Sequence, residues 1–209
     1  MLWGSVTPVE RHDAWYALGE RLAGSVLVRF SGAWWKQRQW PDVLGCALRF
    51  TRASEPSTEA ATGDQDLLLA TIRIPATTLL APLTTHVDDY LRNAYFGVSP
   101  FTDPELGRIK LRLVADHSGP HAESRTASLA MAIARQPVRM RLEAREAKAK
   151  ALYHSVAEIE LSERVMLDQE QLSFDPYRTG RGLSPAGFVH AMRIPVYSAS
   201  RRARKLVTG

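Results

Sequence analysis

The stretch Arg108-Ile109-Lys110-Leu111-Arg112-Leu113-Val114 carries the clearest structural signal in the chain. Its apolar residues alternate with basic residues, which is the period of a β-strand that buries one face and exposes the other. The same alternation returns in Pro137 to Glu143 and in Ala157 to Leu161. These segments predict a sheet that packs one face against a hydrophobic core.

Three earlier segments are more continuously apolar and predict strands that are covered on both faces. They are Ser25 to Ser31, Leu44 to Thr51 and Leu67 to Ile74. Ser128 to Arg135 is either a seventh strand or a helix, because its alanine and methionine content fits both. Many strands without a βαβ rhythm favour a closed antiparallel barrel or a sandwich.

The connections between these segments are polar. Thr51 to Gln65 and Asp116 to Arg125 lack apolar periodicity, so they predict surface loops. Near the C-terminal end, Ser184 can serve as an N-cap with Pro185 at the first helical position, which predicts a helix toward Arg193. The whole pattern predicts an α+β fold, with an antiparallel β-barrel, peripheral helices and a C-terminal helix.

Length and composition favour one domain over residues 1–209, because 209 residues with 45% hydrophobic content can bury one substantial core. The single cysteine, Cys46, excludes an internal disulfide framework, and a reducing, cytoplasmic setting is the expectation. No segment approaches the roughly 20 apolar residues that span a bilayer. Self-association into a homo-oligomer stays open.

The net charge of +5 comes from one end of the chain. Between Tyr177 and Gly209 there are seven basic residues and no acidic one, which leaves 20 basic against 22 acidic residues elsewhere. A basic end of this kind is typical of a solvated helix terminus. It gives nucleic-acid binding only nonspecific support.

Four short elements and an arginine cluster follow one another between Val156 and Leu206. They are Glu158–Leu161, Leu172–Pro176, Gly182–Pro185 and Arg193–Tyr197, followed by Arg201, Arg202 and Arg204. This series resembles the proximal-haem region of catalases, in which an arginine stands four residues before the tyrosine that binds iron. The resemblance implies a barrel of catalase-like type, close to small bacterial catalase-like proteins.

Earlier matches occur in the order of the same family. Val28–Ser31 resembles the strand whose arginine reaches a haem propionate and whose serine supports the distal histidine. Asp42 to Phe50, Asp66-Leu67 and Ile72–Pro75 resemble the strands that follow. The resemblance therefore covers the chain from about Val26 onward.

Haem is the cofactor that this resemblance implies, and it assigns a role to several residues. Tyr197 would bind the iron, Arg193 would hold its phenolate, and Arg29 and Arg204 would pair with the propionates. A free phenol titrates near pH 10, so a phenolate ligand needs a nearby positive charge. Arg193 and Arg201 each lie four residues from Tyr197 and share one face with it if the helix is continuous.

The distal half of the haem site departs from the family pattern. His12 is the only histidine before Arg29, and its surroundings lack the expected motif. Ala70 stands where the family has an asparagine, so Ser31 keeps a supporting role for a histidine that the sequence does not provide. Two alternatives follow: the chain is truncated at its N-terminus, or the distal site is degenerate.

Three functions are compatible with these patterns. The first is a haem-binding protein that acts as a weak or degenerate peroxidase on peroxides or organic hydroperoxides. The second is a non-catalytic barrel that binds an apolar small molecule or a protein partner. The third, a remote alternative, is a phosphodiesterase-type hydrolase, for which His12-Asp13 is a lone and weak metal-pair signal.

Overall fold

The computed structural model describes residues 1–33, 40–72, 84–148 and 150–186. Their elements, in chain order, are β1 (Leu2–Pro8), α1 (Ala14–Leu22), β2 (Gly24–Gly32), β3 (Leu44–Thr51), β4 (Gln65–Ala70), the 3-10 helix η2 (Tyr90–Arg92), β5 (Tyr95–Gly97), β6 (Phe101–Asp103), β7 (Gly107–Ala115), α3 (Arg125–Arg135), β8 (Val138–Glu146), β9 (His154–Arg164) and β10 (Ser184–Pro185).

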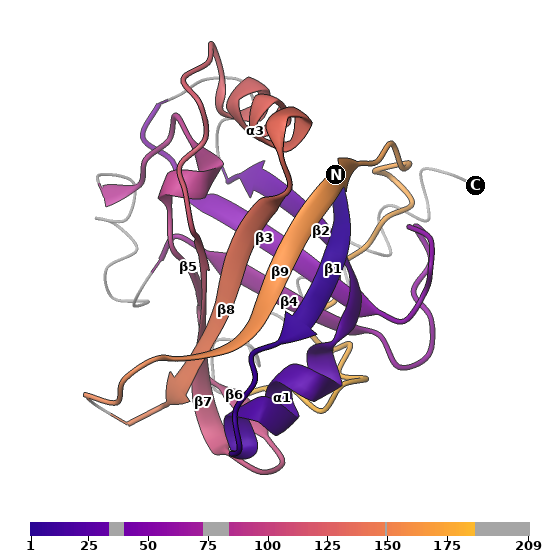
Figure 1. The fold of residues 1–209 in the computed structure, drawn as a ribbon, viewed down its shortest axis with the longest axis vertical. Coiled ribbons are helices and arrows are strands. Elements are labelled where there is room, and N and C mark those ends of the chain that lie inside the picture. Colours follow the sequence, from indigo (N-terminus) through magenta and orange to yellow (C-terminus); the bar gives the residue numbers. More distant parts are fainter. Residues whose placement is uncertain (34–39, 73–83, 149, 187–209) are drawn as a thin grey trace.

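Eight of these strands close into an antiparallel barrel (Figure 1). The order around the barrel is β7-β5-β4-β3-β2-β1-β9-β8, and pairing between β7 and β8 closes the ring. Strands β6 and β10 add a small flap beside the start of β7. The predicted antiparallel barrel is therefore confirmed.

The described helices α1 and α3 lie at opposite ends of the barrel, with α3 near the N-terminus of the chain and α1 at the far end of β1 (Figure 1). Asp13 caps α1, because its Oδ1 accepts hydrogen bonds from the backbone nitrogens of Trp15 and Tyr16 at 3.1 and 3.3 Å. Ser124 caps α3 in the same way, through the Ala127 nitrogen. The stretch from Ser128 to Arg135 is thus helical and not a strand.

The predicted start of a C-terminal helix is wrong for the residues that the structure describes. Ser184 and Pro185 form β10, where they pair with Thr102 and Phe101 of β6. Proline is tolerated in a short edge strand, because the side of the strand that has no neighbour requires no backbone N–H group for pairing. The rest of that predicted helix lies outside the described residues.

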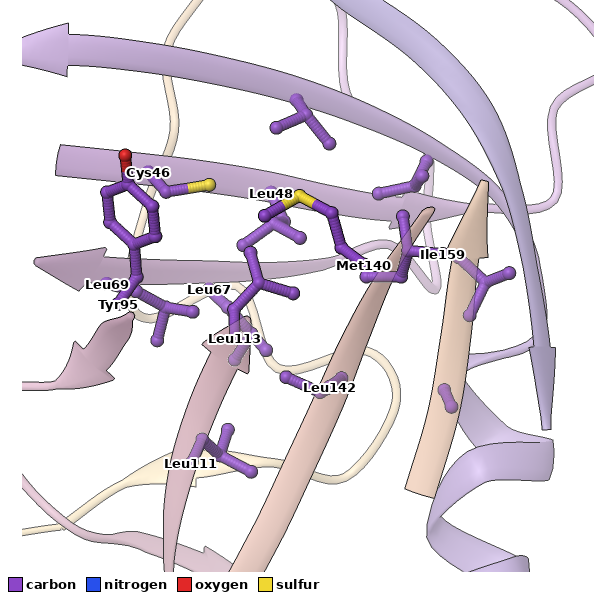
Figure 2. Packing of buried hydrophobic residues seen from close by; sticks show 14 of the residues in the cluster. Cys46, Leu48, Leu67, Leu69, Tyr95, Leu111, Leu113, Met140, Leu142 and Ile159 are labelled. Carbon is purple, nitrogen blue, oxygen red and sulfur yellow. The ribbon is translucent and has the colours of Figure 1, made fainter. Parts of the chain in front are cut away.

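The barrel interior is filled with packed side chains. Figure 2 shows leucines from facing strands that meet Met140, Ile159 and Tyr95. Leu48, Leu67 and Leu113 have no exposed surface. Because such interiors are close-packed and leave no room for a ligand, we expect a ligand to bind at the barrel ends or on the outer face.

A second apolar layer covers the outside of β2, β3 and β4. It consists of Leu27, Ala47, Val165, Leu172 and Phe174. The chain that follows β9 contributes the last three of these residues and lies across the strands. The continuous apolar character of Leu44 to Thr51 therefore reflects burial on both faces, as predicted.

Cys46 lies inside the barrel with 1% of its surface exposed, and burial raises the pKa of its thiol far above the ordinary value. We expect no reaction with an aromatic disulfide reagent in native buffer, because attack requires an accessible thiolate. In urea the thiol should react at a rate that follows the unfolding transition. Immediate stoichiometric labelling of the native protein would contradict this packing.

Candidate functional site

A cavity of about 550 Å³ opens at one end of the barrel, beyond the point where the pairing between β1 and β2 ends. The β1–β2 pairing runs from Val6 opposite Gly24 to Leu2 opposite Val28. Residues 29–32 of β2 continue beyond it and pair only with β3, on their other side. The cavity lies along this edge, and we call it the mouth cavity.

The mouth cavity joins an apolar surface to a basic one. Its side chains come from Met1 and the barrel strands, from η2, from α3 and from the segment after β9: Met1, Leu2, Val28, Arg29, Phe30, Ser31, Tyr90, Thr126, Leu129, Ala130, Arg164 and Gln169. None of the described lining residues is acidic. Its volume lies in the range of about 300–1,000 Å³ that small-molecule sites occupy, so the cavity suits an amphipathic anion.

Arg29 projects from the outer face of β2 onto the second apolar layer. Its guanidinium lies over the ring of Phe174, 5.0 Å from the centroid. The guanidinium of Arg49 lies over the same ring at 5.2 Å. Cation–π contacts of this kind hold an arginine in place with its polar edge turned outward. Phe174 therefore positions Arg29 at the cavity.

Ser31 lies beside Arg29 in the cavity wall, at an exposed position. It pairs with Gly45 of β3, which in turn pairs with Ala70 of β4. A Cβ at Gly45 would lie 3.0 Å from the Ser31 hydroxyl oxygen. Ser31, Gly45 and Ala70 thus form one row across three adjacent strands, and all three have small side chains or none. Each belongs to a segment for which the sequence resembles the catalase family.

Arg164, which the sequence did not indicate, reaches the same cavity through a β-bulge. Gly4 of β1 pairs with Leu161, but Trp3 pairs with Glu163, so Ser162 is an extra residue in β9. The bulge places Arg164 opposite Leu2, which belongs to the barrel core. A bulge re-aims the residues that follow it, and here it turns Arg164 toward the mouth cavity.

Tyr90 of the cavity lining is held by Arg125, and neither residue was predicted from the sequence. The Arg125 Nε donates a hydrogen bond to the Tyr90 hydroxyl at 3.2 Å, and its Nη2 lies 3.6 Å from the Asp42 carboxylate. The Tyr90 ring packs on Phe30 at 5.2 Å between centroids. Because a guanidinium can only donate hydrogen bonds, the Tyr90 hydroxyl oxygen is the acceptor toward Arg125.

A buried ionic cluster fixes the segment that carries Phe174. Asp66 accepts a hydrogen bond from the Arg49 Nε at 3.1 Å and another from the Asp175 nitrogen at 2.7 Å, and it also pairs with Arg178. Burial raises the pKa of Asp66, and the charge of Arg49 is the largest opposing influence. Asp66 has no exposed surface, so the cluster depends on complete pairing.

The buried amide of Gln65 fastens the next part of the same segment. Its Nε2 donates to the carbonyl oxygens of Arg178 and Leu183, and its Oε1 accepts from the nitrogens of Arg181 and Leu183. Arg181 in turn donates to the Arg21 and Ala23 carbonyls at the end of α1. The segment is thereby joined to both the barrel and α1.

The structure brings together two of the predicted site residues, Arg29 and Ser31, in one cavity. The other four, which are Arg193, Tyr197, Arg201 and Arg204, lie outside the described residues. No histidine is among the described residues that line the cavity.

The His12-Asp13 pair lies at the opposite end of β1, before α1 (Figure 1). Both Asp13 oxygens are engaged, one by the helix nitrogens and the other by Arg11. Within the four described ranges, no group of three or more His, Cys, Asp or Glu residues is arranged to hold a metal. The geometry thus adds no support for a hydrolase.

In the part of the chain that the structure covers, no helix has the length and apolar character needed to cross a bilayer. His117 and His121 are exposed and lie in the surface loop predicted for Asp116 to Arg125.

The chain finds no match among protein-family models, and no curated protein matches it significantly.

Proposed function

We propose that this protein binds haem at the mouth cavity. The observation that supports this most directly is the cavity itself: it measures about 550 Å³, it is lined by apolar side chains together with Arg29, and no acidic residue is among its described lining residues. A porphyrin with propionates combines a flat apolar body with carboxylates, and such a molecule matches both surfaces. Arginine suits the carboxylates, because its planar fork binds them bidentately.

The residues that are present fit the group. The side chains of Val28, Phe30 and Leu129 offer apolar contact to the macrocycle, and Arg29 offers its guanidinium to one propionate. Phe174 keeps Arg29 oriented. By the sequence resemblance, Tyr197 would bind the iron with Arg193 and Arg201 near its phenolate, and Arg204 would take the other propionate. Bound ferric haem would supply redox chemistry toward peroxides.

Independent sequence pieces of the resemblance meet on one outer face, which adds support. Arg49 from β3, Asp66 from β4 and Phe174 from the segment after β9 are in direct contact. Arg29 from β2 lies on the same aromatic ring. These residues are far apart in the sequence but adjacent in the fold, as expected if they support one binding site.

The proposed activity toward peroxides is weak. Peroxide cleavage needs a group that moves a proton between the two oxygens. Among the described lining residues, Ser31, Tyr90 and Thr126 offer hydroxyl groups, and a hydroxyl group is an inefficient base at neutral pH. The proposal is therefore a haem-binding protein with weak or degenerate peroxidase activity toward peroxides or organic hydroperoxides.

Titration of the purified protein with haemin tests this function. We expect saturable uptake and a high-spin ferric phenolate spectrum, and Tyr197→Phe should remove that spectrum. Arg29→Gln should weaken binding about tenfold, because it removes a charge-assisted contact. Arg139→Gln is the matched control, since Arg139 is 68% exposed and lies outside the mouth cavity.

A folded protein that takes up no haemin would sink the haem proposal and favour the second function. The apolar side chains in the lining of the mouth cavity also suit a non-catalytic barrel that binds an apolar small molecule. A rise in melting temperature with long-chain fatty acids, together with none on addition of haemin, would identify that alternative.

A further inference from the structure

We propose that a second cavity, at the other end of the barrel, binds the phosphate groups of a small phosphorylated molecule. This cavity measures about 560 Å³ and lies between the start of β7 and the turn that follows β8, and we call it the basic cavity. Strand β8 begins directly after α3, which lines the mouth cavity, and ends at Glu146 in the basic cavity (Figure 1). The proposal is therefore independent of the haem function.

Cations predominate in the lining of the basic cavity. Its lining residues are Pro100, Leu106, Arg108, Lys110, Glu146, Ala147 and Lys148. Glu146 is paired with Lys148, at 3.1 Å between Oε2 and Nζ. Within the described ranges, neither Arg108 nor Lys110 has an ion pair or a side-chain hydrogen bond. The lining thus keeps two positive charges that no described carboxylate neutralises.

Strand pairing sets a third cation beside these two. Arg108 and Lys110 are two residues apart in β7, so their side chains share one face of the sheet. Lys110 lies directly opposite Arg145 of β8, which puts the Arg145 side chain on the same face. Like charges at directly opposed positions destabilise a sheet. A bound anion would remove this repulsion, so the arrangement costs stability in the free protein and favours an anionic ligand.

The carboxylates of the neighbouring elements are engaged by other arginines. Glu143 of β8 pairs with Arg112, whose Nε donates to the Glu143 Oε2 at 2.6 Å. Where β6 turns into β7, Asp103 and Glu105 both pair with Arg21 of α1. Because these three acidic groups already have cationic partners, the charges of Arg108 and Lys110 remain for a ligand.

Arg145 is held in a fixed position next to the basic cavity. Its guanidinium lies over the ring of Tyr153, 5.2 Å from the centroid. Its Nη1 donates a hydrogen bond to the Lys148 carbonyl oxygen at 2.9 Å. These two contacts orient the guanidinium and leave its charge in place, so Arg145 adds to the positive potential that Lys110 and Arg108 produce.

A phosphate group matches this arrangement better than a carboxylate does. It carries about two negative charges and three acceptor oxygens, so it can satisfy several cations at once. Pro100 and Leu106 add an apolar surface to the lining, which suits the remainder of a small organic phosphate. The volume also lies in the range of about 300–1,000 Å³ that small-molecule sites occupy.

Calorimetric titration of the full chain with inorganic pyrophosphate at low ionic strength tests the basic cavity. We expect saturable binding, and Lys110→Gln and Arg108→Gln should each weaken it about tenfold, because each removes a charge-assisted contact. Arg135→Gln is the matched control, since it removes the same charge from an exposed arginine in the last turn of α3 and should leave binding unchanged. The urea midpoint of Lys110→Gln should equal or exceed that of the wild-type protein, because the repulsion from Arg145 is gone.

The contrary outcomes are distinct. Absence of pyrophosphate binding overturns the proposal. Equal weakening by Arg135→Gln and Lys110→Gln overturns it too, because binding would then follow the net charge of the protein alone. A Lys110→Gln protein that loses both affinity and stability would show that Lys110 serves the fold. If an oligothymidylate strand binds more tightly than pyrophosphate and loses affinity in the same two variants, the partner is a nucleic acid and the small-molecule assignment is wrong.

Discussion

Replacement of Asp66 by alanine should lower the free energy of unfolding by about 3–5 kcal/mol, the cost of leaving a buried charge without its partner. Arg49 is 2% exposed, and Asp66 supplies the only carboxylate that pairs with it among the described residues. The Asp66→Ala variant also loses the acceptor for the Asp175 nitrogen and for Arg178. Urea unfolding followed by tryptophan fluorescence measures the change.

Arg139→Ala is the matched control for this prediction. Its ion pair with Glu160 is largely exposed, so its loss should cost about 0–1 kcal/mol. The double variant Arg49→Met, Asp66→Ala should be less destabilised than the sum of the single variants, because it leaves no guanidinium of Arg49 to be buried alone. Strict additivity, or a cost for Asp66→Ala as small as that of the control, would contradict the cluster.

Replacement of Gly4 by alanine should destabilise the protein by about 3 kcal/mol, which is the upper end of what overpacking typically costs. A Cβ at Gly4 would lie 2.0 Å from the Glu160 carbonyl oxygen, and backbone atoms cannot move aside as the end of a side chain can. The two strands must therefore shift at the bulge. Thermal and urea unfolding give the magnitude.

The same substitution should weaken haemin binding, because Gly4 borders the bulge beyond which Leu2 and Arg164 line the mouth cavity. Ser5→Ala is the control: Ser5 is the next residue of β1 and is exposed, so its change should be small in both assays. A Gly4→Ala protein with wild-type stability and wild-type haemin affinity would show that the close approach of β1 and β9 is unnecessary for either property.

Several strands could be predicted from the sequence because their patterns are local. Leu44 to Thr51 matches β3 at both ends, and the alternation over Arg108 to Val114 lies within β7. The N-terminal elements β1 and α1 were missed. In β1, Gly4 and Pro8 are residues that usually disfavour a strand. Gly4 is accommodated because β9 approaches it closely, and Pro8 because it is the last residue of the strand.

The candidate site divides in the same way. Arg29 and Ser31 could be predicted, because they belong to a short strand motif that a family resemblance makes recognisable. Tyr90 and Arg164 could not, since neither has a neighbouring sequence pattern that indicates a cavity. Arg125 begins α3 and reaches Tyr90 of η2 across 35 positions of the chain, so only the folded chain brings them together.

The amino-acid sequence by itself determined the strand-rich character of this protein, because the alternation of apolar and polar side chains is a local property that burial of one face enforces. The tertiary structure alone decided where a ligand has room. The early end of the β1 ladder opens the mouth cavity, and one extra residue in β9 turns Arg164 toward it. Register and bulges arise from pairing between distant segments, which no single stretch of sequence specifies.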